Sequence, residues 1–306
     1  MNKKQKLGQY FSTTNLFNDN PLKVWLNEIP NWETQSLLEP FAGACDILKY
    51  FPNREWSCFD IDPIVDNVKY RDTITDFPKG FDVCITNPPY LAKNRVSRLK
   101  ENITLKYEDL YLDALEQCLE NCKFVSVIVP STFIGSSKMK DRCLIIDKID
   151  KIAFSDTSNP ACVAYFVPYK VKKTLTFVNG KQIFLNIDNT PSNVVLDISF
   201  NVPDGNYVFT AVDTKIKRIS IDDDLKNFDR EKFLKNTSRY CSIIKTEYPI
   251  DLIEFNAFIE KWRKETQDYF LTSFKSPLNS NKFYRKRLSF RQLKWIISQI
   301  QYYDIL

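Results

Sequence analysis

The stretch Ser-Leu-Leu-Glu-Pro-Phe-Ala-Gly-Ala-Cys-Asp-Ile, residues 36–47, places an acid and a glycine-containing turn directly after a short apolar run. A second apolar run ends at residues 86–90 in Thr-Asn-Pro-Pro-Tyr. Buried strands of a parallel sheet are near-continuous apolar runs, and polar groups that follow them lie at the edge where the strands end. The two stretches therefore predict two strand ends that carry polar groups.

Apolar runs of strand length alternate with segments of helical period over the first 170 residues. The expected strands lie at 36–42, 56–61, 81–86, 124–130, 151–155 and 162–169, and the expected helices at 21–29, 102–122 and 136–147. This alternation indicates an α/β fold, with a parallel sheet that has helices on both faces. Ligands of such sheets bind at the carboxyl ends of the strands, which is where the two quoted stretches lie.

The pattern changes beyond residue 170. Shorter alternating segments follow, with turn signals at 178–180 and 203–206 and a helical segment at 252–264. We therefore expect two domains, 1–170 and 171–306, of which the second is smaller and of mixed α+β type.

Histidine is absent from the chain, which excludes Ser-His, Cys-His and histidine general-base chemistry. Two of the eight cysteines, Cys118 and Cys122, are four residues apart, but no histidine or second pair completes a zinc site. We therefore expect no metal. No run approaches the roughly 18 apolar residues of a membrane helix, so we expect a soluble, cytoplasmic protein without a membrane partner.

A basic segment lies near the C-terminus. Residues 275–294 hold seven lysines and arginines and no acid, interleaved with Phe274, Phe283, Tyr284 and Phe290. This composition is typical of a surface that faces nucleic acid, whereas a solvated helix face usually mixes both signs of charge.

The strand ends predict a nucleoside pocket. The turn at 39–44 contains a glycine, so its backbone N–H groups can approach a ligand closely. Asp60 ends the second expected strand, where an acid can accept hydrogen bonds from ribose hydroxyls, and Asp72 could face an adenine edge. Each acid alone is a weak signal, because an aspartate at a strand end is more often a turn or helix cap.

The order of these motifs resembles the S-adenosylmethionine-dependent N6-adenine DNA methyltransferases of restriction-modification type, in the group whose catalytic domain comes first. The resemblance covers about the first 170 residues and rests on Gly8-Gln9-Tyr10-Phe11-Ser12, Glu39-Pro40-Phe41-Ala42-Gly43, Asp60-Ile61-Asp62-Pro63, Asp72 and Asn87-Pro88-Pro89-Tyr90. It implies a Rossmann-like methyltransferase sheet in residues 1–170 and a DNA target-recognition domain in 171–306. Cys45 stands where a second glycine is usual, and Thr13 where proline often follows.

The resemblance implies S-adenosylmethionine as the cofactor. Tyr10 and Phe11 would close over its methionine end, with Ser12 or Thr13 near its carboxylate. The full set of expected cofactor residues is Tyr10, Phe11, Ser12, Thr13, Glu39, Pro40, Phe41, Ala42, Gly43, Asp60, Ile61, Asp72, Asn87 and Pro89.

The adenine amine is a poor nucleophile because its lone pair is delocalised into the ring. Two acceptors aimed at its N–H bonds, the Asn87 side-chain oxygen and the Pro88 carbonyl, would favour the reactive pyramidal form. Tyr90 could stack on a base that has left the duplex. Phe154 is a second candidate for stacking, or a core residue. The expected catalytic residues are Asn87, Pro88, Pro89, Tyr90 and Phe154.

The expected partner is duplex DNA, bound chiefly through its phosphates by Lys282, Arg285, Lys286, Arg287 and Arg291. The default for a modification enzyme is a monomer, with a cognate restriction endonuclease acting separately. The same chemistry also serves RNA adenine and protein glutamine methyltransferases, which remain the alternative. A nucleic-acid-binding protein without catalysis is disfavoured, because Asn87 and Asp60 are both retained.

A fused nuclease is a further alternative. Asp204, Asp213 and Lys215 loosely match an acid-acid-lysine metal site. The Pro-Asp-Gly-Asn context at 203–206 favours a hairpin instead, so magnesium is not expected.

Overall fold

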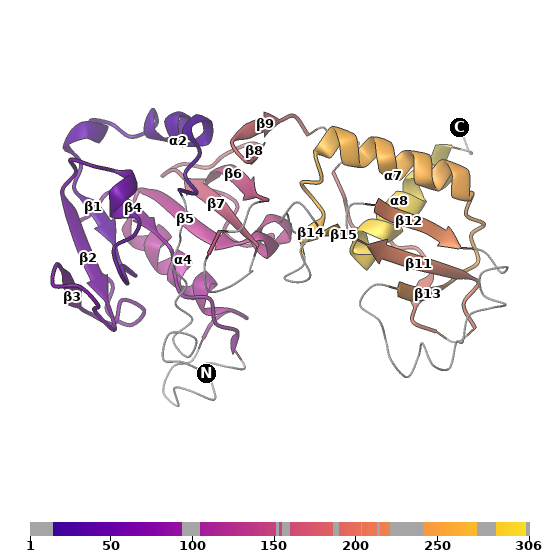
Figure 1. The fold of residues 1–306 in the computed structure, drawn as a ribbon, viewed down its shortest axis with the longest axis horizontal. Coiled ribbons are helices and arrows are strands. Elements are labelled where there is room, and N and C mark those ends of the chain that lie inside the picture. Colours follow the sequence, from indigo (N-terminus) through magenta and orange to yellow (C-terminus); the bar gives the residue numbers. More distant parts are fainter. Residues whose placement is uncertain are drawn as a thin grey trace. The chain divides into compact units, whose positions relative to one another are not determined.

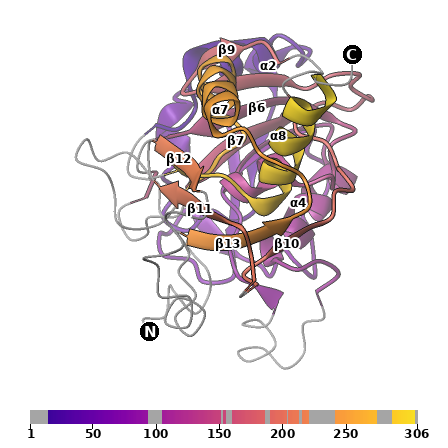
Figure 2. The same ribbon diagram turned by 90° about the vertical axis from the view of Figure 1, so that its right-hand side faces the viewer.

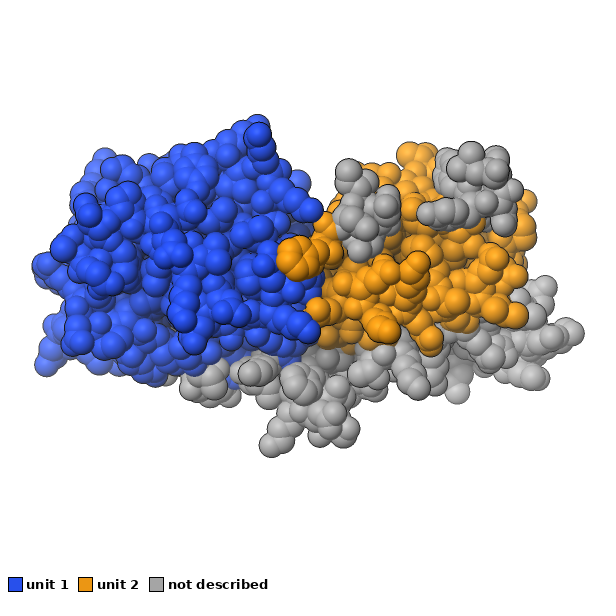
Figure 3. All heavy atoms as spheres, turned by 90° about the horizontal axis from the view of Figure 1, so that it is seen from above, with its two compact units in different colours: residues 1–183 blue, residues 184–306 orange. Residues whose placement is uncertain are grey.

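The computed structural model describes residues 15–93, 105–150, 153–154, 160–185, 190–202, 204–212, 215–220, 241–273 and 286–303. The chain forms two compact units, Met1–Ile183 and Phe184–Leu306, which are blue and orange in Figure 3. Each unit has its own sheet, and each is described by itself below.

The first unit is built on a nine-stranded sheet with the order β3-β2-β1-β4-β5-β7-β6-β8-β9 (Figure 1). Its strands are β1 (Leu37–Glu39), β2 (Trp56–Asp60), β3 (Val68–Tyr70), β4 (Val83–Thr86), β5 (Phe124–Pro130), β6 (Cys143–Ile149), β7 (Ala161–Phe166), β8 (Leu175–Val178) and β9 (Lys181–Ile183). The first five are parallel, whereas β7 runs antiparallel to both β5 and β6. The expected α/β sheet is thereby confirmed, with its first five strands parallel.

The position of β1 decides where a ligand can bind. It lies between β2 and β4, so the chain order reverses there, which creates the switch point that parallel sheets use for ligands. Because β1, β2, β3 and β4 are parallel, their carboxyl ends meet at one edge of the sheet. All residues of β4 and β7 are buried, as the continuous apolar runs predicted.

Helices α2 (Asp19–Leu26) and α4 (Leu110–Asn121) cover opposite faces of this sheet. Trp25 of α2 packs on Tyr165, which pairs with Ser126 of β5. Cys118 of α4 contacts Cys84, which pairs with the preceding residue of β5. Successive residues of a strand point to opposite faces, so the two helices lie on different sides, as expected.

Helix α4 begins later than its sequence pattern predicted. The Asp109 carboxylate accepts a hydrogen bond from the Tyr111 N–H and caps the first turn, and residues 105–109 lie outside the helix. At the other end, the Arg142 guanidinium donates to the carbonyls of Leu119, Cys122 and Lys123. These bonds satisfy backbone oxygens that a helix C-terminus otherwise leaves without partners.

The helix expected at 136–147 is wrong. Residues Cys143–Ile149 form β6, which lies between β7 and β8 in the sheet. Its isoleucines suit a buried strand, and pairing on both sides overrides the helical spacing of the sequence. Most of the strand expected at 151–155 lies outside the described residues.

The sheet continues beyond residue 170, so the first unit ends at Ile183. Strands β8 and β9 form a hairpin whose two-residue turn is Asn179-Gly180, with φ angles of 49° and 78°. Asparagine and glycine tolerate these positive angles, which makes this pair a strong hairpin signal. The turn predicted at 178–180 is therefore confirmed.

The second unit has a four-stranded sheet covered on one face by two helices (Figure 2). Its elements are β10 (Ile198–Phe200), β11 (Tyr207–Val212), β12 (Lys215–Ser220), β13 (Cys241–Thr246), α7 (Leu252–Thr266), α8 (Phe290–Tyr303) and a short ribbon of β14 (Thr272–Ser273) with β15 (Lys286–Arg287). Phe209 and Ile244 of the sheet, Trp262 of α7 and Leu293 of α8 share its core. The expected α+β character and the helix predicted at 252–264 are present.

The hairpin expected at 203–206 is wrong. Strands β10 and β11, which flank this segment, do not pair with each other, because both pair with β13. Gly205 lies against β13, and a Cβ atom there would be 2.3 Å from Ile243 Cγ2. The glycine therefore permits a close approach of two chain segments rather than a tight turn between neighbouring strands.

Candidate active site

Glu39, the last residue of β1, connects the two motifs that the sequence analysis singled out. Its side chain is buried, with 1% exposed. Oε1 accepts a hydrogen bond from Thr86 Oγ1 at 2.5 Å and another from the Phe41 N–H at 3.2 Å. Thr86 directly precedes Asn87, so one carboxyl group ties the end of β1 to the end of β4.

The surroundings of Glu39 are poorly suited to a negative charge. Burial raises the pKa of its carboxyl group to about 8, against the opposing effect of hydrogen bonds from Thr86 and the backbone N–H groups of Phe41 and Asn87. Oε2 is buried and has no hydrogen-bond partner among the described residues. A buried acceptor without a partner is costly, and a bound cation with N–H donors would satisfy it.

Gly43 and Asp60 are in direct contact. The Gly43 N–H donates to Asp60 Oδ2 at 2.8 Å, and the Asp62 N–H donates to Asp60 Oδ1 at 2.8 Å. Gly43 has a φ of 51°, which glycine adopts without strain. Asp60 is only 4% exposed, whereas Asp62 is partly exposed at the same turn. The structure thus brings the turn after β1 and the acid at the end of β2 together.

Asp72 follows β3 at the same edge of the sheet. Its Oδ1 accepts from the Ile74 N–H at 3.3 Å, which is a turn-capping contact. The neighbouring Thr73 donates through its hydroxyl to the Pro40 carbonyl at 2.8 Å and so holds the turn that follows β1. The predicted role of Asp72 toward an adenine edge stays a prediction.

Asn87 is partly buried at the end of β4, and Pro88 is buried. The Tyr90 hydroxyl lies 2.7 Å from Asn87 Oδ1 and 2.9 Å from the Ile128 carbonyl oxygen of β5. Both of these oxygens are acceptors, and a phenol has one proton to donate. The hydroxyl can therefore donate to only one of these two oxygens at a time, and it lies between the Asn87 amide and the backbone of β5.

The ring of Tyr90 packs edge-to-face on two other rings. Its centroid is 6.2 Å from that of Tyr111 and 6.0 Å from that of Phe154. Tyr90 is 7% exposed and Phe154 is 1% exposed. Phe154 thus lies in the core of this structure, next to the residue with which it was expected to stack on a base.

The sequence profile of the Eco57I restriction-modification methylases matches residues 6–158, which is half of the chain. The chain belongs to this family. The match spans the turn after β1, the acid after β2 and the Asn-Pro-Pro-Tyr segment after β4. A search of curated proteins returns no match.

Three solved structures are similar to part of this family member. A protein described as a class I S-adenosylmethionine-dependent methyltransferase, from Listeria monocytogenes, is 14% identical, with 51% of this chain and 62% of that chain covered and a TM-score of 0.39. A type I restriction enzyme modification subunit from Vibrio vulnificus YJ016 is 11% identical over 54% and 47% of the two chains, with a TM-score of 0.37. A type I restriction-modification methyltransferase subunit from Streptococcus thermophilus is 14% identical over 53% and 46%, with a TM-score of 0.35. This chain covers less than two thirds of each.

Cys45 stands where a second glycine was expected, and its backbone has a conformation that glycine adopts more easily. Its φ is 60°, in the left-handed region that non-glycine residues rarely adopt. Its N–H donates to the Ala42 carbonyl at 2.7 Å, which closes the turn after Gly43. The methylase turn therefore keeps its shape with a residue that strains the backbone.

Thr86 and Thr73 were missed by the sequence reasoning. The only available signals were local ones: Thr86 is the one hydroxyl residue of β4, and Thr73 directly follows the candidate Asp72. Of the predicted residues, Tyr10, Phe11, Ser12 and Thr13 lie outside the described residues, as do Lys282 and Arg285.

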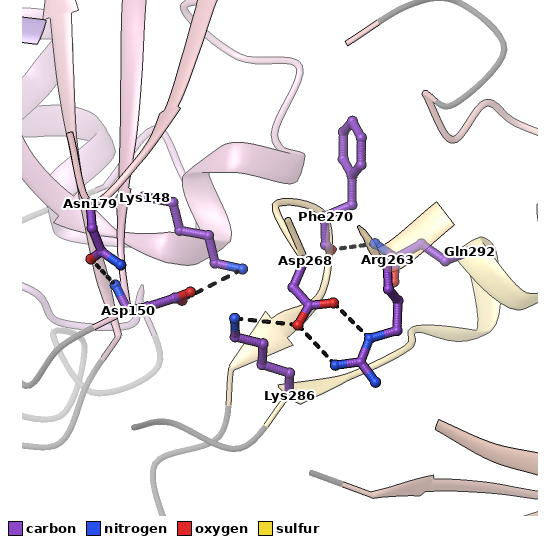
Figure 4. A network of polar contacts seen from close by, with 8 residues as sticks. All are labelled: Lys148, Asp150, Asn179, Arg263, Asp268, Phe270, Lys286 and Gln292. Atoms are coloured by element: carbon purple, nitrogen blue, oxygen red, sulfur yellow. Dashed lines mark hydrogen bonds and ion pairs between the residues drawn. The ribbon is translucent and has the colours of Figure 1, made fainter. Parts of the chain in front are cut away.

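The remaining candidates for DNA contact have different surroundings. Lys286 of β15 is partly buried and lies 3.5 Å from Asp268, which also forms a two-bond pair with Arg263 at 2.6 and 2.8 Å (Figure 4). This network ties β15 to the end of α7. Arg287 is partly buried and Arg291 is exposed.

A second polar group in Figure 4 belongs to the first unit. Lys148 and Asp150 are 4.0 Å apart, and the Asp150 N–H donates to Asn179 Oδ1 at 3.0 Å. The group joins the end of β6 to the hairpin turn that follows β8.

No cluster of three potential metal ligands occurs in the described ranges. Within the same ranges, none of the helices has the length and apolar character that crossing a bilayer requires.

Proposed function

We propose that this restriction-modification methylase transfers a methyl group from S-adenosylmethionine to the N6 amine of an adenine in duplex DNA. The hydrogen bond between Glu39 and Thr86 carries the proposal, because it holds the cofactor motif and the Asn-Pro-Pro-Tyr segment side by side at the switch point. A methyl donor and its acceptor need such adjacency for in-line transfer.

The residues present fit S-adenosylmethionine. Glu39 Oε2 is buried and has no hydrogen-bond partner among the described residues, so it could accept from the ammonium group of the cofactor once the carboxyl has lost its proton. Gly43 permits a close approach of backbone, and Asp60, at the end of β2, would accept hydrogen bonds from the ribose hydroxyls. Tyr10, Phe11, Ser12 and Thr13 remain predicted contacts to its methionine end. When bound, the cofactor would supply a methyl group activated by a positively charged sulfur.

Asn87 and Pro88 would accept hydrogen bonds from the two N–H bonds of the target amine. An amide oxygen can accept two bonds, so the contact from Tyr90 does not exhaust Asn87 Oδ1. The link through Tyr90 to Ile128 would hold the amide still, which is what preorganised stabilisation of developing charge requires. Pro89 restricts the backbone between Pro88, which would contact the target amine, and Tyr90, which contacts Asn87.

An adenine in duplex DNA must leave the base stack to reach Asn87. Stacking of that base on Tyr90 would require the ring to turn from its packing against Tyr111 and Phe154, because Tyr90 is almost fully buried. Base flipping in this account therefore includes a side-chain rearrangement of Tyr90. In this rearrangement the Tyr90 ring would move away from Phe154, and Phe154 would stay in the core instead of stacking on the base.

The second unit would act as the target-recognition domain, and the enzyme would work as a monomer beside a separate restriction endonuclease. The proposed recognition role of the second unit rests on the basic, acid-free composition of the segment that includes β15 and the start of α8.

The proposal is tested with purified protein, tritiated S-adenosylmethionine and unmethylated duplex DNA. Asn87→Ala should lower methyl transfer by about 10²–10³-fold, because a preorganised polar group at the reacting centre is lost. Its affinity for the cofactor should stay within about threefold. Asn256→Ala, which removes an amide on α7, serves as the matched control. Transfer by Asn87→Ala at the wild-type rate would overturn the assignment.

A further inference from the structure

Helix α8 is buried along its middle, and among its residues 290–300 the first two are the exposed ones. Leu293, Ile296 and Ile297 are at most 1% exposed, whereas Phe290 is 42% exposed and Arg291 is also exposed. An exposed large apolar ring in the first turn of an otherwise buried helix has no evident role in the core. This turn lies in a long stretch without acids, because the chain has no aspartate or glutamate between Asp268 and Asp304.

Phe290 is held in place by Phe200 of β10. The two rings stack with centroids 4.1 Å apart and an angle of 15° between their planes. Phe200 is partly buried and packs on the core of the unit, so it supports one face of the Phe290 ring, whose side chain is 42% exposed. A partly exposed ring that is supported by a second ring can serve as a stacking platform.

Two cations flank this platform. Lys294 lies one helical turn after Phe290, with Nζ 5.8 Å from the Phe200 centroid and donating to the Leu196 carbonyl at 3.2 Å. Arg291, the next residue of the helix after Phe290, is exposed. The helix terminus itself offers little, because Ser289 and Gln292 form a reciprocal capping pair, with the Ser289 N–H donating to Gln292 Oε1 at 2.8 Å.

We propose that Phe200, Phe290, Arg291 and Lys294 form a DNA-contacting surface, in which an unstacked base or a deoxyribose of the substrate packs on Phe290 and phosphates pair with Arg291 and Lys294. The proposal rests on the proposed function, which makes duplex DNA the substrate. DNA fits better than a protein partner, because one open ring flanked by cations complements a base with its phosphates. A stable protein interface needs a larger apolar centre.

The test measures binding of labelled duplex DNA by fluorescence anisotropy at several salt concentrations, with S-adenosylhomocysteine present. Phe290→Leu keeps an apolar side chain but removes the ring, whereas Phe290→Tyr keeps the ring. Arg291→Gln removes one charge. The matched controls are Ile253→Ala, an apolar residue on α7 that is 83% exposed, and Lys261→Gln, a cation on α7 whose side chain is 77% exposed.

Phe290→Leu should raise the Kd for DNA at least fivefold, and Phe290→Tyr should stay within twofold, because loss of base stacking weakens binding about 5- to 150-fold. Arg291→Gln should reduce the slope of log affinity against log salt by about 0.9. Both controls should bind as the wild type does. Cofactor affinity should be unchanged in all five variants. The thermal unfolding midpoint should be unchanged in the four variants other than Phe290→Leu. For Phe290→Leu, a lower midpoint would report a loss of packing.

Wild-type affinity in both Phe290→Leu and Arg291→Gln would overturn the surface while leaving the proposed function intact. Absence of DNA binding by the wild type itself would overturn both. If Phe290→Leu changes the sedimentation mass of the protein and not its DNA affinity, the surface joins two copies of the chain, and the proposal is also overturned.

Discussion

Glu39 at the end of β1 and Thr86 at the end of β4 share a hydrogen bond of 2.5 Å. The chain separates them by one full pass through β2 and β3, yet the parallel sheet places them at neighbouring strand ends. This contact fixes the spacing between the predicted cofactor turn and the predicted acceptor residues.

Stability should depend on pH through Glu39. Its pKa is raised from 4.5 to about 8 in the folded protein, so the folded state binds the proton more tightly than the unfolded state. The resulting stabilisation is complete below about pH 4.5 and is lost as the pH rises through about 8. Glu39→Gln should therefore raise the unfolding temperature relative to the wild type at pH 9 more than at pH 5, measured by calorimetry without cofactor. An equal effect at both pH values would contradict the assigned pKa.

Cofactor affinity should rise with pH for the same reason. At pH 6 the Glu39 carboxyl is protonated in the empty protein, and binding of a cation next to Oε2 must expel that proton. The affinity should increase toward pH 8 by up to about tenfold per pH unit. Titration calorimetry in two buffers of different ionisation enthalpy should show proton release for the wild type and none for Glu39→Gln. Identical proton release by the two proteins would assign the titration to another group.

The two acids after β2 can be separated by substitution. Asp60→Ala should weaken cofactor binding by at least tenfold, because it removes the predicted ribose acceptor and the partner of the Gly43 N–H. Asp62→Ala, at the same turn, is the control and should bind within about threefold of the wild type. The opposite ranking by calorimetry would show that Asp62 is the ribose ligand.

Substitutions of Cys45 should follow its backbone conformation. A φ of 60° costs a non-glycine residue about 1–2 kcal/mol, and a β-branched residue more. Cys45→Gly should leave the free energy of unfolding unchanged or raise it by up to about 1 kcal/mol, and Cys45→Val should lower it by at least about 1 kcal/mol. Denaturant titration measures both. Equal stability of the two variants would show that the position is not left-handed in solution.

Gly205 should tolerate no side chain. A Cβ atom would lie 2.3 Å from Ile243 Cγ2 and 2.7 Å from the Ile244 carbonyl oxygen, so β13 must shift to admit it. Gly205→Ala should destabilise the second unit by about 1–3 kcal/mol. Gly135→Ala, where a Cβ atom would meet no other atom within 4 Å, should change stability by less than about 0.5 kcal/mol. Similar losses of stability in Gly205→Ala and Gly135→Ala would contradict the close approach of Gly205 to β13.

The sequence predicted those parts of the fold that depend on local composition. Strands β1, β2, β4 and β5 coincide with apolar runs, and the Asn179-Gly180 turn follows from the backbone freedom of its two residues. It failed at β6, where sheet pairing on both sides decides the conformation. It also failed to predict the pairing around 203–206, where a turn is present but the flanking strands β10 and β11 both pair with β13 instead of with each other.

The same distinction applies to the candidate site. Gly43, Asp60 and Asn87 could be named from their motifs, and the structure brings the turn after β1 into contact with Asp60 and, through Glu39 and Thr86, next to Asn87. Thr86 and Thr73 could not be found, because their roles come from hydrogen bonds to residues distant in the chain. The burial of Tyr90 could not be predicted from the sequence either, because it depends on ring contacts with Tyr111 and Phe154.

The most direct test is to incubate the purified protein with S-adenosylmethionine and unmethylated duplex DNA, digest the DNA to nucleosides, and analyse them by mass spectrometry. We predict N6-methyladenine, produced by the wild type and not by Asn87→Ala. A cofactor-bound wild-type protein that forms no N6-methyladenine on DNA of varied sequence, and instead methylates RNA or protein, would contradict the account.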